Sequence, residues 1–290
     1  MHKFLRAIGF SDITKKDLEM ILDEVITRPE IMKITKDSEG NEFAELSGSF
    51  AANAGITVRG TYQEDDSFHM DYYYPYVFGT SITTNEQIDV EKHAEKESYA
   101  GVCDEVNLGV TLIFYIQNVA DYLAETNRHL SKIHYGAMLA GLSTEGKILC
   151  LVVERKKNDV PAIQKNDRHN QLIAQAREGD EDAIESLTLE DMDTYALLSQ
   201  RVMKEDIFSI VKSTFMPFGI ESDQYTVLGE IIDCVTMENK LTHEKLYGMK
   251  LLCNNIQFDV CINEKDLLGE PAIGRRFRGN VWMQGNLCLE

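Results

Sequence analysis

TVLGEIIDCVTME at residues 226–238 begins a series of four apolar runs that sets the expected fold; the others read EKLYGMKLLCN (244–254), NIQFDVCINEKDLLG (255–269) and GRRFRGNVWMQGNLCL (274–289). Each run is short and rich in β-branched, aromatic and other apolar residues, and polar residues that favour turns separate it from the next. The pattern predicts strands with tight connections, at a spacing that suits a small antiparallel barrel or curled sheet.

Outward from these runs, the N-terminal half predicts a helix followed by an antiparallel sheet. Residues 14–17 have the spacing of a capping box, and apolar residues then recur at helical spacing up to Pro29. Beyond that point the apolar period changes to two in the runs 42–50, 56–62 and 68–75. This period predicts a meander of strands with one wet face.

The second part of this half predicts a hairpin. The apolar runs 133–142 and 147–155 flank Ser-Thr-Glu-Gly at 143–146, a combination typical of two strands joined by a turn. Residues 88–99 are charged and predict a weakly helical surface segment, whereas 119–131 fit either a strand or a short helix.

These patterns divide the chain into three expected parts. Residues 1–157 form an α+β domain, with an N-terminal antiparallel sheet and a leading helix. Residues 158–221 form a helical connector, which is acidic because 12 acidic and 5 basic residues lie between 167 and 221. Its last helix is expected at 205–215. Residues 222–290 form a β-barrel-like module, either as a separate domain or as part of one continuous core.

Composition excludes some classes of protein. A chain of 290 residues buries enough surface for a substantial core, and its formal charge is −19. An acidic surface repels phosphate backbones and anionic lipids, so a general nucleic-acid binder and a membrane partner are disfavoured. Six cysteines show no CxxC, and no apolar run has the length of a signal peptide or a membrane span. We therefore expect a cytoplasmic protein.

No motif in the sequence requires a particular chemistry. GxxxxGK[ST], a strand-following GxGxxG and GxSxG are absent, which leaves a P-loop NTPase, a kinase and a serine hydrolase unsupported. His129 and His134 lack an accompanying HExxH, and the acidic group at 180–193 lacks the spacing of an EF-hand. The expectation is no catalytic residue, no metal and no cofactor.

One candidate pocket lies near the aromatic run at 72–76. His69 and Asp71 would share one face of a strand, and with Tyr72 and Tyr74 they could line an enzyme pocket. Cross-strand polar pairs and core aromatics are the commoner arrangement, so the pocket is kept as an alternative.

The one basic cluster comprises Arg275, Arg276 and Arg278, interleaved with Phe277 and close to Trp282. In a small barrel, basic residues with a stacking aromatic could hold single-stranded nucleic acid or an anionic ligand. In the alternative arrangement the arginines face solvent or pair with the acidic helices while the phenylalanine faces inward, which the net charge favours.

Three long segments carry a resemblance: MHKFLRAIGFS (1–11), LTLEDMDTYALLSQRVMKEDIFSIVKSTFMPFGIESDQYTVLGEI (187–231) and CNNIQFDVCINEKDLLGEPAIGRRFRGNVWMQG (253–285). Over essentially its whole length the chain resembles a bacterial family catalogued only as a domain of unknown function, which implies a soluble bacterial protein and assigns no activity. Separately, the C-terminal order of three strands, a short helix at 264–268 and a strand is similar to an oligonucleotide/oligosaccharide-binding (OB) barrel, with one strand not accounted for.

The functional expectation is a non-catalytic, cytoplasmic binding protein whose partner is another protein. Two alternatives stay open: binding of single-stranded nucleic acid or an anionic ligand by the OB-like module, and an enzyme with a pocket near Tyr72 to Tyr76. The sequence indicates no oligomeric state.

Overall fold

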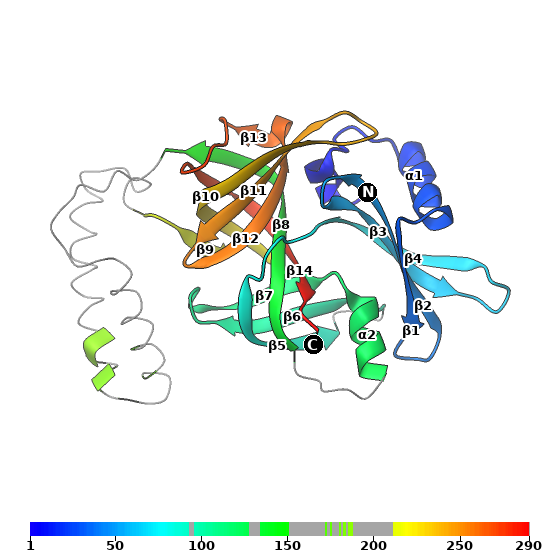
Figure 1. Ribbon diagram of the computed structural model, residues 1–290, viewed down its shortest axis with the longest axis horizontal. Coiled ribbons are helices and arrows are strands. Elements are labelled where there is room, and N and C mark those ends of the chain that lie inside the picture. Colours follow the sequence, from blue (N-terminus) through cyan, green and yellow to red (C-terminus); the bar gives the residue numbers. More distant parts are fainter. Residues whose placement is uncertain are drawn as a thin grey trace.

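The computed structural model describes residues 1–92, 96–127, 134–150 and 211–289, with isolated positions between 172 and 187. Within them the chain is mainly β and forms two sheets (Figure 1). The helical elements are η1 (Lys3–Ile8), α1 (Lys15–Thr27), α2 (Val119–Asn127) and η2 (Glu264–Asp266). The predicted α+β class therefore holds in a coarser form: a mostly β fold with an N-terminal antiparallel sheet and a leading helix.

The first sheet, called sheet A, is the predicted meander, but the expected wet face is wrong for its middle, because residues 43–48 and 54–60 are buried on both faces. It contains β1 (Ile31–Lys36), β2 (Glu42–Ala51), β3 (Ala54–Tyr62) and β4 (Phe68–Val77) in that order, all antiparallel. The predicted capping box also forms, because the Thr14 hydroxyl accepts a hydrogen bond from the backbone N–H of Asp17 at the start of α1.

The larger sheet contains the remaining strands: β5 (Thr84–Lys92), β6 (Tyr99–Glu105), β7 (Val110–Ile116), β8 (His134–Leu149), β9 (Thr214–Pro217), β10 (Gln224–Glu238), β11 (Lys245–Cys253), β12 (Ile256–Asn263), β13 (Leu267–Leu268) and β14 (Arg276–Leu287). The strands and the short helix predicted between residues 225 and 289 are confirmed. Five of these strands pair in a ring, since β10 pairs with β11, β11 with β12, β12 with β8, β8 with β14, and β14 with β10.

The predicted hairpin at 133–155 is wrong, because β8 is one continuous strand through residues 143–146. Both of its halves pair with the same strand, β14, over registers from Leu287↔Ala137 to Arg276↔Leu149. The register shifts once, between Gly279 and Val281, so the turn-like residues form a β-bulge. The Ser143 hydroxyl donates to the backbone oxygens of Glu145 and Asn280 and thereby holds the bulge.

In two other segments the structure differs from the prediction, and in a third it decides between the two predicted alternatives. Residues 88–92 belong to β5, in which Ile88 is buried and charged side chains face outward, so the weakly helical prediction is wrong there. Residues 119–127 are helix α2. At the end of the predicted helix 205–215, residues 214 and 215 are extended in β9; positions 205–210 lie outside the described residues.

The strands of the ring come from both sides of the expected domain boundary, since β8 precedes residue 157 and the other four follow residue 222. The three-part division itself stays a prediction, and nearly all of the acidic connector lies outside the described residues. In the part of the chain that is described, no helix combines the length and the apolar character needed to cross a membrane.

Two apolar cores fill the part of the molecule that the structure describes. The first lies within the larger sheet and includes Phe114, Phe258 and Phe277. The second brings Leu46 of sheet A together with Trp282 of β14, along with residues of η1 and α1. The second core therefore joins the two sheets, and β8 and β14 run side by side next to it (Figure 1).

Candidate ligand groove on β8, β10 and β14

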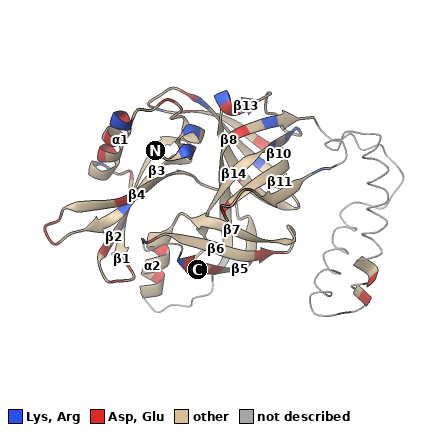
Figure 2. Cartoon of the chain, turned by 180° about the vertical axis from the view of Figure 1, so that it is seen from behind, with Lys and Arg blue, Asp and Glu red and all other residues tan. Residues whose placement is uncertain are grey.

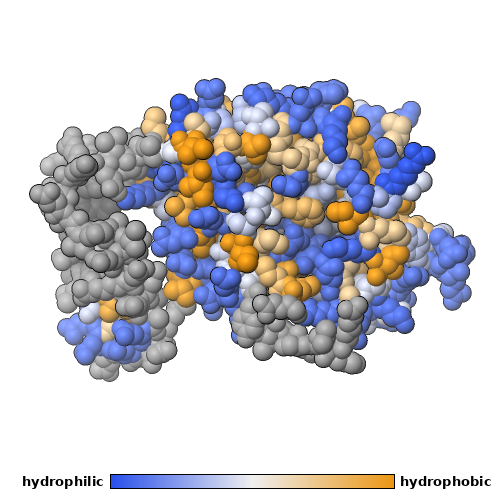
Figure 3. Space-filling view, viewed as in Figure 1, coloured by the Kyte–Doolittle hydropathy of each residue, from blue (hydrophilic) through white to orange (hydrophobic). Residues whose placement is uncertain are grey.

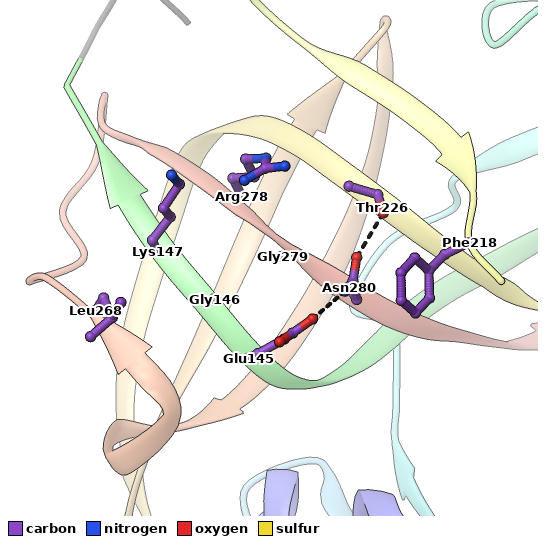
Figure 4. A pocket seen from close by; sticks show the side chains of 9 residues that line it. All are labelled: Glu145, Gly146, Lys147, Phe218, Thr226, Leu268, Arg278, Gly279 and Asn280. Atoms are coloured by element: carbon purple, nitrogen blue, oxygen red, sulfur yellow. Dashed lines mark hydrogen bonds between the residues drawn. The ribbon is translucent and has the colours of Figure 1, made fainter.

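A shallow groove, called the outer groove, lies on the outer face of β8, β14 and β10 (Figure 4). Lys147 of β8 stands directly opposite Arg278 of β14, and Gly146 stands opposite Gly279. Successive side chains of a strand point to opposite faces, so the two cations project outward together. A Cβ on either glycine would meet the inward-facing ring of Phe277, which explains why both positions are glycine.

The rest of the groove combines a polar floor with apolar edges. The Thr226 hydroxyl donates to the Asn280 side-chain oxygen at 2.7 Å, and the Asn280 amide donates to the Glu145 carboxylate. These two bonds align the floor across three strands (Figure 4). Phe218 and Leu268 stand at the edges with 41% and 74% of their surface exposed, and the cavity measures about 340 Å³.

The charge of the outer groove differs from that of the chain. Lys147, Arg278 and Glu145 give the lining a formal excess of one positive charge, whereas the chain carries −19. Figure 2 shows acidic residues spread over many elements, among them α1, α2 and β5. A guanidinium and an ammonium on one face suit a carboxylate or phosphate group, since charge-assisted hydrogen bonds are the strong ones.

Of the basic cluster expected from sequence, Arg276 is buried and holds the backbone. It is 5% exposed, its Nε donates to the Cys150 carbonyl oxygen at 2.9 Å, and one terminal nitrogen donates to the Val211 carbonyl oxygen at 2.7 Å. Burial lowers the pKa of Arg276. Arg275 is exposed and donates to the Glu270 carbonyl oxygen.

Trp282 lies in the second core. It is 6% exposed, its indole N–H donates to the Asp223 carboxylate at 2.7 Å, and its ring stacks on Phe4 with centroids 5.3 Å apart. Of Arg275, Arg276, Arg278 and Trp282, Arg278 alone lines the outer groove.

The tyrosines of the alternative pocket surround Arg59, whose side chain is fully buried. Its guanidinium donates to the hydroxyls of Tyr72, Tyr74 and Tyr115 at 2.9, 3.2 and 2.7 Å, and its Nε donates to Glu45 at 2.7 Å. Burial raises the pKa values of Tyr74 and Tyr115, so both hydroxyls stay neutral. The space beside Tyr72 and Tyr74 is thus filled by a protein side chain.

His69 and Asp71 do not form the expected pair on one face of the strand. A register shift between Arg59 and Gly60, opposite Tyr72 and Met70, leaves Asp71 in a bulge and breaks the alternation that would put the two on one face. Asp71 accepts from Lys96 through its backbone oxygen at 2.7 Å. Within the described residues, His69 and Asp71 form no hydrogen bond or ion pair with each other.

Sequence reasoning missed most of the outer groove. The arginine-rich run pointed to Arg278, but Lys147, Thr226 and Phe218 come from three other segments, and only strand pairing brings them to it. Glu145 and Lys147 alternate around Gly146, which indicates a strand with charged side chains on its outward face. This signal was missed because residues 143–146 were predicted to form a turn. Among the described residues, no group of three or more His, Cys, Asp or Glu side chains could hold a metal ion.

Comparison with curated proteins and comparison with solved structures each give no match. A family model described as "Domain of unknown function, E. rectale Gene description (DUF3881)" matches residues 5–285 of the 290. Because this match spans nearly the whole length, the chain belongs to that family.

Proposed function

We propose that the protein is a non-catalytic binding protein and that its outer groove holds an acidic segment of a partner protein. The observation that carries the proposal is the direct opposition of Lys147 and Arg278 across the β8–β14 pair. Two cations side by side on one face raise the local positive potential, which attracts an acidic segment and fixes how it is oriented. Arg278 can in addition hold a carboxylate through two parallel hydrogen bonds.

The apolar edges define the rest of the partner segment. Phe218 and Leu268 flank the cations, and Met216 and Ile220, at alternate positions along the same segment, are 54% and 99% exposed. Aromatic and arginine side chains are enriched where proteins bind one another. A segment that alternates carboxylate and aliphatic side chains matches this arrangement. Figure 3 shows further apolar side chains reaching the surface in small groups between hydrophilic ones.

We also infer that the ring of five strands is an OB-like module in which β8 is the strand missing from residues 222–290. The ring of pairings and the short helix between β12 and β14 support this inference. A fold by itself does not assign a function, so the outer groove carries the proposal. A cytoplasmic location belongs to the same proposal and is supported by six free cysteines.

Fluorescence anisotropy tests the proposal with a labelled hexapeptide of alternating glutamate and leucine. We expect binding that weakens as salt rises, and at least about tenfold weaker binding by Arg278→Glu, because one cation is replaced by an anion. Arg275→Glu is the matched control: it makes the same charge change three residues away, outside the outer groove, and should bind like the original protein.

Three results would overturn the proposal. The first is equal binding of the peptide by the original protein and Arg278→Glu. The second is tighter, salt-dependent binding of a labelled single-stranded oligothymidine than of the peptide, which would favour a nucleic-acid partner. Loss of binding in Arg275→Glu to the same extent would also contradict it, because the effect would then be one of net charge.

A further inference from the structure

A second cavity, called the seam cavity, lies between sheet A and the start of α2 and measures about 310 Å³. Its floor is the face of sheet A that carries Ser47 of β2 and Thr57 of β3. Ser47 is paired with Ile31 of β1 on one side and with Thr57 on the other. Gln117 and the start of α2 close it from the other side. Pockets at the boundary between packed units are the usual place for small ligands.

The polar groups of the floor already have partners. Glu45 accepts from Arg59 through one oxygen and from the Ala120 backbone N–H, at 2.8 Å, through the other. The hydroxyls of Ser47 and Thr57 are 2.8 Å apart and bond to each other. The charges and polar groups at the deep end of the seam cavity therefore compensate one another. A ligand with a net charge would lose its hydration there without gaining an oppositely charged partner.

The rim of the seam cavity carries one charge of each sign. Lys33 Nζ of β1 lies 2.6 Å from Asp121 Oδ2 of α2, and the two side chains are 41% and 38% exposed. A half-exposed ion pair of this kind contributes little net stability, because water solvates both charges when the pair opens. Opening it therefore presents a cation and an anion side by side at small cost.

The walls beside this pair are apolar. Four side chains form them: Ile31 of β1, Phe78 directly after the end of β4, Met138 of β8 and Leu287 of β14. Leu287 is 3% exposed, and Ile31 stands at the mouth with 44% exposed. One cation, one anion and an aliphatic wall thus meet in a space suited to a small molecule.

We propose that the seam cavity binds a free α-amino acid with an aliphatic or thioether side chain. The carboxylate of the amino acid pairs with Lys33 and its ammonium pairs with Asp121, so each charge of the rim exchanges one partner for another. The side chain of the amino acid packs against Phe78, Met138 and Leu287. A zwitterion leaves the net charge of the site unchanged, which suits a neutral floor.

Thermal unfolding and isothermal titration with L-leucine and L-methionine test this proposal. We expect both amino acids to raise the unfolding temperature, since a ligand that binds the native state alone stabilises it. Leucinamide lacks the carboxylate and isocaproate lacks the ammonium, so each should bind about tenfold more weakly or worse. Equal binding of leucine and either analogue would overturn the proposal, as would absence of binding at millimolar leucine.

Variants of the rim give the matched comparison. Lys33→Met and Asp121→Asn should each weaken leucine binding about tenfold or more, whereas Lys36→Met, an exposed lysine on the same strand, should leave it unchanged. Ile31→Trp should fill the mouth of the seam cavity and abolish leucine binding. This variant keeps the proposal testable if a charge variant does not fold. Unchanged leucine binding in Lys33→Met or in Ile31→Trp would overturn the proposal. Arg278→Glu should bind leucine normally, which separates this site from the outer groove.

Discussion

Arg59 is one of the residues that join sheet A to the rest of the molecule. Besides the tyrosines and Glu45, it donates to the backbone oxygens of Ile116 and Gln117 at 3.0 and 2.9 Å, directly before α2. A fully buried charge is tolerated only when it is paired and hydrogen-bonded, and here all three guanidinium nitrogens have acceptors. Arg59 is therefore a structural ion-pair partner. It occupies the space beside Tyr72 and Tyr74, where the sequence offered an enzyme pocket as an alternative.

Removal of Arg59 alone should be more costly than removal of the pair. Arg59→Met leaves Glu45 buried without its cation and should lower the free energy of unfolding by about 3–5 kcal/mol. Arg59→Met combined with Glu45→Leu should lower it by clearly less than the sum of the two single changes, because no uncompensated charge remains. Urea unfolding of the three variants measures this coupling; additive effects would contradict the role given to Arg59.

Glu244 should make stability depend on pH in the acid range. Partial burial raises the pKa of its carboxyl, but hydrogen bonds from Lys265, Ser11 and Asn263 outweigh burial and hold that pKa below its ordinary value. A carboxyl with a lower pKa in the folded state stabilises the fold above its unfolded pKa of about 4.3. This contribution is lost as pH falls through the folded-state pKa.

Glu244→Gln should therefore lose less stability than the original protein between neutral pH and a pH below about 4. Urea unfolding at both pH values measures the difference. Glu39→Gln, at an exposed position of the turn between β1 and β2, is the control and should keep the original pH dependence. Equal acid sensitivity of Glu244→Gln and the control would refute the assignment.

At the scale of single elements, β8 is the strand on which the larger sheet depends. It pairs with β14 along most of its length, with β12 in parallel over residues 140–143, and with β5 at its start. It also pairs with β13 at Gly146 and Lys147. One strand can serve four neighbours because it is long and because the bulge near Ser143 turns its second half. Both cations of the outer groove depend on this pairing.

Gly146→Ala tests the packing under the outer groove. The added Cβ would lie 2.4 Å from the Phe277 ring, so we expect overpacking to lower the free energy of unfolding by about 1–3 kcal/mol. Phe277→Leu in the same chain should recover part of this loss, since the ring that blocks the methyl group is gone. Chemical denaturation of the single and double variants checks the prediction. If Phe277→Leu adds its own cost to that of Gly146→Ala with no recovery, the ring is not the cause.

At the scale of the molecule, the two sheets share a core and a polar seam. The side-chain amides of Gln117 and Gln284 bond to each other at 2.8 Å and to the backbone of β4 at Pro75 and Val77. Trp282 packs at the same seam, against Phe4 from the N-terminal segment and Tyr115 from β7. Because buried polar and apolar contacts both cross the seam, the sheets should not separate before either one unfolds.

Trp282 is the single tryptophan of the chain and reports on this seam directly. Its emission should be blue-shifted and poorly quenched by acrylamide in the folded protein, because its surface is 6% exposed. On addition of urea, its emission and the far-ultraviolet circular dichroism should change in one coincident transition. Two separated transitions would instead support independent folding of the predicted N-terminal and C-terminal parts.

The sequence by itself determined the local elements whose signals lie within a few residues. The capping residue Thr14, the strands of sheet A and the strands from 225 to 289 all follow from periods and turn residues, which act over short distances. The arginine-rich run likewise pointed to Arg278 as a residue of a candidate site. Local chemistry is enough for these predictions because each element buries its own apolar face.

Tertiary structure alone decided which of these residues meet. Ser-Thr-Glu-Gly at 143–146 has the composition of a turn, yet pairing with β14 on both sides keeps the chain extended, because a turn would forfeit that ladder of hydrogen bonds. Lys147 reaches Arg278 across 131 positions of sequence, and Arg59 fills the aromatic pocket from a different strand. Such contacts depend on long-range burial and pairing, which no short period in the sequence encodes.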